Sequence, residues 1–232
     1  MNTLIIGAAG GIGTILVDDL VDLSFNLLLG YRSSRPIVKS AESQPVDGEN
    51  FQSVLDFVQY GKDKFGKIDA IVNLAGNLIL KPAHLCSENE FNDTINKNLK
   101  SSFAVVRAAG ALLEDCSIVF LSTAATNIGL ANHELISSAK SGIEGLVKSA
   151  SKTYSRKNIR FNSVAPGLVA TPLSSKIVSN PIALKASEKM HALGRIGKPK
   201  DISNMIQFLI NPHNDWITGQ NFVVDGGLSS TK

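Results

Sequence analysis

Three glycines, Gly7, Gly11 and Gly13, directly follow an apolar run with the residue types of a buried strand. From Ile12 onward the apolar residues recur at helical spacing, so the glycines fall in a tight turn between a strand and a helix. The N–H groups of such a turn and the positive end of the helix dipole both attract an anion. Glycine suits the turn because a Cβ atom would block the close approach of a phosphate. The spacing predicts a dinucleotide-binding loop; the alternative is a glycine-rich turn of another α/β domain.

Arg32 is the second residue whose position indicates chemistry. It lies 19 residues after Gly13, at the end of a second apolar run at residues 25–31. In dinucleotide-binding folds an acidic residue near this position holds the ribose hydroxyls of NAD, whereas an arginine accommodates the 2′-phosphate of NADP. No acidic residue occurs among residues 31–35, so electrostatics favours NADP(H) over NAD(H). The alternative is an ordinary solvated arginine at a strand end.

Both features need a sheet to position them, and the hydrophobic pattern predicts one. Strand-like runs at 25–31, 68–74, 117–121, 159–164 and 221–224 alternate with helical patterns at 51–58, 88–113, 137–157 and 202–209. This alternation predicts an α/β fold, a single Rossmann-type doubly wound parallel sheet flanked by helices on both faces. Ligands are then expected at the carboxyl ends of the strands.

Two segments lack a clear pattern. The 13 residues between Arg32 and Val46 contain two prolines and leave room for about one turn of helix, which makes the second crossover short. Residues 166–193 hold three prolines and little periodicity, which suits a mobile flap over a substrate. In that flap His191 is expected to be solvated. Trp216, further along, is expected to contribute to packing.

The composition is that of one globular domain spanning residues 1–232, with 44% hydrophobic and 19% charged residues. A net charge of +3 without a long basic run does not suggest nucleic acid as a partner. Cys86 and Cys116 have neither metal-ligand spacing nor a disulfide framework, so no bound metal is expected. The lack of a disulfide framework fits a protein of the reducing cytoplasm. No apolar run reaches the roughly 18 residues that a membrane helix needs, so no membrane partner is expected.

Several motifs in order along the chain carry a resemblance to a known family. They are the glycine spacing, the run Asn73-Leu74-Ala75-Gly76, residues 162–167 with Thr171-Pro172, residues 194–199, and residues 218–220 with 225–227. Together they resemble the short-chain dehydrogenase/reductase family over essentially the whole chain, and most of all its 3-oxoacyl carrier-protein reductase-like branch. That branch usually has a full helix in the second crossover, so the adenine side of the groove is expected to be more open here.

The resemblance implies a set of residues along a bound NADP(H). Asp47 stands where the family places an acid that contacts adenine, residues 73–76 support the sheet beside the adenine ribose, and the segment from residue 162 runs along the nicotinamide. The implied cofactor-binding residues are Gly7, Ala9, Gly11, Ile12, Gly13, Tyr31, Arg32, Ser33, Asp47, Asn73, Ala75, Gly76, Lys140, Pro166, Gly167, Val169 and Thr171.

The catalytic motif is where the resemblance breaks. The family has Tyr-x-x-x-Lys on a helix, a serine 13 residues before the tyrosine, and an asparagine on the preceding long helix. Here Lys140 fits the lysine, Thr123 the serine and Asn98 the asparagine, but Ile136 takes the place of the tyrosine. Hydride reduction of a carbonyl leaves an alkoxide that must be protonated, and isoleucine has no proton to give.

Three interpretations remain open. His133, seven residues before Lys140, has the spacing that enoyl reductases of this superfamily use for their tyrosine, and an imidazole titrates near neutrality; the alternative is a solvent-facing histidine beside Glu134. A substrate such as an iminium or a conjugated alkene could instead take its proton from water ordered by Lys140 and Asn98. Finally, the chain could bind NADP(H) without turnover, as a sensor or a partner subunit.

The resemblance also implies partners. A small-molecule substrate is expected, together with a homodimer or homotetramer formed through the helices predicted at 88–113 and 137–157. Small residues on these helices are expected to permit close packing there, namely Ala108, Ala109, Gly110, Gly142 and Gly145.

Overall fold

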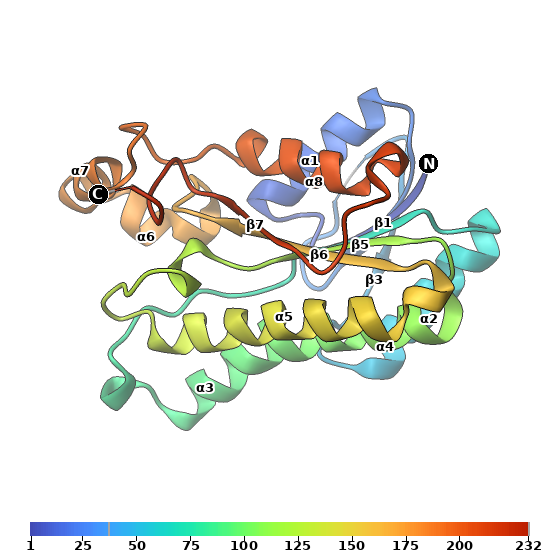
Figure 1. The fold of residues 1–232 in the computed structure, drawn as a ribbon, viewed down its shortest axis with the longest axis horizontal. Helices are drawn as coiled ribbons and strands as arrows, with labels where there is room; N and C mark the ends of the chain where they lie inside the picture. The colour runs from blue at the N-terminus through green and yellow to red at the C-terminus, as the bar shows by residue number, and fades with distance from the viewer. Residues whose placement is uncertain (37, 232) are drawn as a thin grey trace.

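A parallel sheet forms the centre of the protein in a computed structural model that describes residues 1–36 and 38–231 (Figure 1). Its strand order is β3-β2-β1-β4-β5-β6-β7, and every neighbouring pair is parallel. The strands are β1 (Asn2–Ile6), β2 (Asn26–Tyr31), β3 (Glu42–Pro45), β4 (Ala70–Asn73), β5 (Ser117–Leu121), β6 (Arg160–Pro166) and β7 (Asn221–Val224). The order reverses between β1 and β4, which is the doubly wound arrangement predicted.

Helices cover both faces of this sheet (Figure 1). Helices α1 (Gly11–Asp22) and α8 (Pro199–Ile210) pack together on one face, and α2 (Phe51–Phe65), α4 (Ser101–Leu112) and α5 (Glu134–Thr153) lie on the other. The shorter elements are α3 (Glu88–Thr94), the π-helical turn η2 (Ile95–Lys100), α6 (Ser175–Val178), α7 (Pro181–Met190) and the 3-10 turns η1 (Ala83–Leu85), η3 (Ala124–Thr126), η4 (Ser155–Lys157), η5 (Pro172–Ser174) and η6 (Pro212–Asn214). None of the helices described is long and apolar enough to cross a membrane.

The sheet separates two hydrophobic cores, one under each helical layer. In β1, Leu4 belongs to the core under α2, α4 and α5, whereas Ile5 belongs to the core under α1 and α8. Successive residues of a strand point to opposite faces, so a strand covered on both faces must be apolar at every position. This is why the central strands could be recognised as continuous apolar runs.

The edge strand β3 was not predicted. The short crossover was expected to hold a turn of helix, but the described residues of that segment form no helix, and Glu42–Pro45 pairs with β2 instead. The residues of β3 are polar because the strand has only one neighbour in the sheet, and a proline is tolerated at such an edge. Hydrogen bonds from Lys64, Tyr60 and Gln44 lower the pKa of Glu42 to about 2.

The small residues expected at a subunit interface mostly pack inside the chain. Ala108 and Ala109 are fully buried, and a Cβ atom at Gly110 would overlap the Tyr154 ring. A Cβ atom at Gly142 would approach Leu99 to 2.8 Å. Of these positions, Gly145 alone has open space for a side chain. Close packing of these small residues therefore joins α4 and α5 within one chain, and they are not evidence for an interface.

Candidate active site

The glycine turn lies at the carboxyl end of β1 and opens directly into α1. Gly7 has a positive φ of 81°, and a Cβ atom there would approach the Ala75 nitrogen to 2.9 Å. A Cβ atom at Gly13 would lie 2.6 Å from the Gly7 carbonyl oxygen. Gly10 is the N-cap of α1, where no described side chain caps the helix and the first turn holds no acidic residue. The positive end of α1 is therefore available to a phosphate.

Residues distant in sequence complete this cradle. A Cβ atom at Gly11 would lie 2.9 Å from Thr171 Cβ and 2.9 Å from Pro172 Cδ, so the segment after β6 packs against the turn. Thr171 thus lies beside the glycine turn. Val169, also assigned to the cofactor, is buried and pairs with Gly197. Ile12 is half-buried in the first turn of α1, and Ala9 is exposed on the turn itself.

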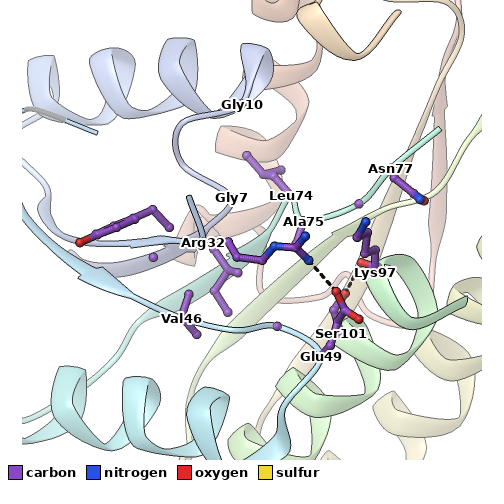
Figure 2. A pocket seen from close by; sticks show the side chains of 15 residues that line it. Gly7, Gly10, Arg32, Val46, Glu49, Leu74, Ala75, Asn77, Lys97 and Ser101 are labelled. Carbon is purple, nitrogen blue, oxygen red and sulfur yellow. Dashed lines mark hydrogen bonds and ion pairs between the residues drawn. The ribbon is translucent and has the colours of Figure 1, made fainter. Parts of the chain in front are cut away.

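A cavity of about 340 Å³ continues from the glycine turn along the carboxyl ends of β1, β2 and β4 (Figure 2). The residues assigned from the sequence that line it are Gly7, Tyr31, Arg32, Ala75 and Gly76. Two other residues assigned from the sequence form hydrogen bonds with the backbone of neighbouring loops. Asn73 Oδ1 accepts the Ala75 N–H at 3.1 Å, and Asp47 Oδ1 accepts the Glu49 N–H at 3.0 Å. Asp47 and Ser33 are exposed and do not line this cavity.

Sequence reasoning missed several residues of this cavity, and Glu49 is the most consequential of them. Arg32 Nη1 donates to Glu49 Oε1 at 2.6 Å, and Figure 2 shows the two side chains pointing toward one another. Glu49 lies in the turn between β3 and α2. Because β3 was not predicted, nothing in the sequence placed this turn beside the end of β2.

Lys140 and Asn98 meet behind Gly76. The Lys140 ammonium donates to the Leu121 carbonyl oxygen at 2.8 Å, and burial lowers the pKa of Lys140 from its ordinary 10.5 to about 8. A Cβ atom at Gly76 would lie 2.5 Å from Asn98 Oδ1 and 3.7 Å from Lys140 Nζ. Gly76 lines the first cavity and is therefore the residue that lies between that cavity and these two buried groups.

Asn98 comes from the π-helical turn η2, where the helix widens. Its Nδ2 donates to Asn77 Oδ1 at 2.8 Å and to the Thr94 carbonyl oxygen at 2.9 Å. The hydroxyls of Ser101 and Ser102 donate to its carbonyl oxygen at 3.1 and 2.8 Å. Its Oδ1 is buried and has no hydrogen-bond partner among the described residues. A buried acceptor without a partner is costly, and at this position it points to a water or ligand donor.

A second cavity, of about 390 Å³, is lined by residues that follow β5, by the start of α5 and by the end of β6. Four side chains singled out from the sequence line it: Thr123, His133, Ile136 and His191. Pro166 and Gly167 line it as well, and most of the remaining wall is aliphatic. Ile136 lies one turn before Lys140 on α5, so it separates the lysine from this second cavity.

His133 is the N-cap residue of α5 and is half-buried. Its Nδ1 lies 2.8 Å from the Ala131 carbonyl oxygen. A carbonyl can only accept, so this contact places a proton on Nδ1 and leaves Nε2 as the nitrogen that exchanges protons with a neighbour. Thr123 Oγ1, on the same cavity wall, accepts the Ala125 N–H at 3.3 Å.

His191 and Trp216 correct two expectations. His191 was expected to be solvated, but it is 4% exposed: its Nδ1–H donates to the Ser187 carbonyl at 2.6 Å, and its Nε2 accepts the Leu168 N–H at 3.3 Å. It thereby joins α7 to the end of β6. Trp216 was expected to contribute to packing, but it is 98% exposed.

Replacing His191 by alanine is expected to lower the free energy of unfolding by about 2 kcal/mol, because it removes two buried hydrogen bonds and the packing of the ring. Urea denaturation followed by circular dichroism measures this. His213→Ala, at an exposed position, is the control and is expected to change the free energy by less than about 0.5 kcal/mol. Equal effects of the two substitutions would contradict the structural role of His191.

The sheet order, the glycine turn after β1 and the lysine behind Gly76 define a Rossmann-type fold. A family model described as enoyl-(acyl carrier protein) reductase matches residues 7–229. The 3-oxoacyl-[acyl-carrier-protein] reductase FabG of Thermotoga maritima is 30% identical over 97% of this chain and 96% of its own. A chloroplastic tropinone reductase homolog of Arabidopsis thaliana is 29% identical over 99% of this chain and 76% of its own.

Solved structures agree. The ligand-free aldohexose dehydrogenase of Thermoplasma acidophilum superposes with a TM-score of 0.91 at 26% identity and covers 100% of this chain and 95% of that one. A short-chain dehydrogenase family protein of Francisella tularensis has a TM-score of 0.89 at 24% identity, with 99% of both chains covered. The chain belongs to the short-chain dehydrogenase/reductase family.

Proposed function

We propose that this protein is an NADP(H)-dependent reductase that transfers a hydride to a carbonyl, an enone or an imine. The observation that carries the proposal is that two cavities approach Lys140. The first leads from the glycine turn to Gly76, behind which the lysine lies, and the second is aliphatic and lined by Ile136, one helical turn away. The NADP-bound structure of ElxO, with a TM-score of 0.90 and 25% identity over 99% of both chains, supports this cofactor.

The residues around the first cavity fit a dinucleotide. The N-terminus of α1 and the glycine turn suit the pyrophosphate, and Arg32 suits a 2′-phosphate at the far end. Lys140 and Asn98 suit the hydroxyls of the second ribose, which would supply the donor that Asn98 Oδ1 lacks. When bound, NADPH supplies the hydride. Pro166 and Gly167, at the mouth of the second cavity, suit the side of the nicotinamide ring.

The proton is assigned to His133. Hydride addition at the carbonyl carbon moves the π electrons to oxygen, and His133 Nε2 gives that oxygen a proton when the imidazole is cationic. The Ala131 carbonyl keeps the proton of Nδ1 in place during this transfer. Thr123 contributes a hydroxyl on the same wall, but a hydroxyl is too weak an acid to be the donor.

The test begins with a fluorescence titration of NADPH and continues with turnover against ketones, enones and imines. Replacing His133 by alanine is expected to lower kcat by at least about 100-fold at pH 7, because general acid catalysis is lost. The dissociation constant of NADPH should stay unchanged, since His133 does not line the first cavity. His84→Ala, on the exposed turn η1, is the control. Full turnover in the His133 variant would remove this residue from the mechanism.

Two other interpretations predict different results. If water held by Lys140 and Asn98 supplies the proton, turnover survives in the His133 variant and falls when Asn98 is replaced by alanine; the unpartnered Asn98 Oδ1 favours this route for imines and enones. If the protein is a non-catalytic sensor or partner subunit, NADPH binds and no substrate of the panel is reduced. Ile136, which cannot donate a proton, supports that alternative.

We further propose a homodimer or homotetramer through α4 and α5, with the reducing cytoplasm as its location. Phe91 and Phe103 are exposed on the helix that runs from α3 to α4, which supports an interface on this layer. Cys86 and Cys116 are free thiols, which supports a reducing compartment. Burial raises the pKa of the Cys116 thiol, so this cysteine is protonated and unreactive.

A further inference from the structure

A carboxylate lies beside the arginine that is assigned to the 2′-phosphate. Arg32 Nη1 and Glu49 Oε1 are 2.6 Å apart, and both residues line the first cavity (Figure 2). The Arg32 side chain is 57% exposed and the Glu49 side chain 26%. Arg32 follows β2 and Glu49 precedes α2, so the pair joins two loops at the rim of the cavity where a ribose 2′ group would lie.

The local structure holds Glu49 in place independently of Arg32. Its backbone N–H donates to Asp47 Oδ1 at 3.0 Å. The next residue, Asn50, caps α2 and accepts the N–H groups of Gln52 and Ser53 at 2.9 and 3.0 Å. Hydrogen bonds on both sides of Glu49 fix the backbone of this turn, so the Cα atom of Glu49 stays at the rim when Arg32 moves, and its carboxylate stays within reach of a 2′ group.

No other cation of the cavity neutralises Glu49 in the described structure. Lys97 also lines the cavity, but its ammonium is bound to Asp93 Oδ2 at 2.7 Å. The electrostatic potential at the position of a 2′ group therefore depends mainly on the Arg32 guanidinium and the Glu49 carboxylate. Their contact cancels much of the positive potential that Arg32 alone would present.

We infer that Glu49 sets the cofactor specificity of this site by competing with the 2′ group for Arg32. The inference rests on the proposed function. To bind a 2′-phosphate, Arg32 must give up its ion pair with Glu49. To accommodate a 2′-hydroxyl, Arg32 need not move, and the Glu49 carboxylate accepts a hydrogen bond that the hydroxyl donates. Glu49 therefore lowers the preference for NADPH over NADH that Arg32 creates.

The substitution Glu49→Gln tests this, because glutamine keeps the size of the side chain and removes its charge. Calorimetric titration with NADPH, NADH, 2′,5′-ADP and 5′-AMP separates the 2′ group from the rest of the cofactor. We expect NADPH and 2′,5′-ADP to bind about fivefold more tightly to the variant, as one screened charge at a surface predicts. NADH and 5′-AMP should change by less than about twofold, and the gain should shrink at high salt.

Two further variants sharpen the result. Glu114→Gln removes one negative charge at an exposed position that does not line the cavity, and it should leave all four affinities unchanged. In an Arg32→Gln background the gain from Glu49→Gln should fall below about twofold, since the arginine for which Glu49 competes is absent.

An unchanged or weakened affinity of Glu49→Gln for NADPH, with normal binding by the natural protein, would overturn this inference alone. A gain of equal size in the Arg32→Gln background would overturn it as well, because Glu49 would then act by repulsion and not through Arg32. Failure of the natural protein to bind either dinucleotide would overturn the proposed function and this inference together.

Discussion

Replacing Ile136 by tyrosine in the His133→Ala variant, which lacks the proton donor proposed for the natural protein, is expected to raise kcat/KM for the reduction of a ketone by at least about 100-fold, the usual contribution of a general acid. A side chain at position 136 lies one helical turn before Lys140 and borders the aliphatic cavity that holds Thr123. A tyrosine hydroxyl there would face the substrate on one side and the Lys140 ammonium on the other. The neighbouring cation would lower the pKa of the phenol and make it a better acid.

The matched control is Ile136→Phe in the same His133→Ala variant, which adds the same ring without a hydroxyl. Ile136 is 3% exposed but lines a cavity of about 390 Å³, so an aromatic ring has space on that side. The measurement is NADPH oxidation with a panel of ketones, for both variants and the natural protein. Equal activity of the two variants would show that space and not a proton limits turnover. No activity in either, with NADPH still bound, would favour the sensor interpretation.

Replacing Lys140 by methionine is expected to have two opposite effects. Turnover should fall at least about 100-fold, because the variant lacks the ammonium that we propose to hold the second ribose of the cofactor. The free energy of unfolding at pH 7 should rise by about 1 to 3 kcal/mol. Burial lowers the pKa of Lys140 to about 8, so holding the charged form inside the protein costs about 3 kcal/mol, partly offset by the hydrogen bond to Leu121.

The pH dependence of the free energy of unfolding is a second test of the cost assigned to the buried Lys140 charge. Between pH 8 and 10.5 the unfolded chain keeps the Lys140 proton and the folded chain does not, so the natural protein gains stability as the pH rises through this range. The advantage of the Lys140→Met variant should therefore shrink over the same range. Urea denaturation at several pH values measures both chains. The control, Lys148→Met, lies exposed on the same helix and should show neither effect. A less stable Lys140 variant at pH 7 would contradict the cost assigned to the buried charge.

The central sheet could be predicted because parallel strands that are buried on both faces appear in the sequence as continuous apolar runs. Leu27, Leu28 and Leu29 of β2 are all buried, and alternation of faces makes each of them necessary. The strand β3 has no apolar run in its sequence. Its strand structure comes from the pairing of its backbone with β2, which the side-chain pattern does not indicate. The residues that depend on β3 were missed with it, and Glu49 is the main example.

The site was predictable only where a motif fixes the backbone. Gly7, Gly13 and Lys140 have positions that follow from a local turn or one helix. His191 could not be placed, because its partners, Ser187 and Leu168, come from a segment without periodicity. Asn98 matches a motif, but the wide helical turn that carries it has no signature in the hydrophobic pattern.

That wide turn also constrains how the chain can vary in length. In η2 the Ser101 N–H bonds to the Asn96 carbonyl five residues earlier, so the helix from Glu88 to Leu112 contains a residue that a regular α-helix would not accommodate. Deleting one residue of η2 would return a regular helix, and because the wide turn accommodates its extra residue locally, α3 and the buried face of α4 would keep their partners. The widened backbone that carries Asn98 would be lost. A deletion within the regular turns of α4 would instead rotate the residues beyond it by about 100°. The packing of this helix therefore tolerates a change of length at η2 alone, and that change falls on the residue that carries the unpartnered amide oxygen.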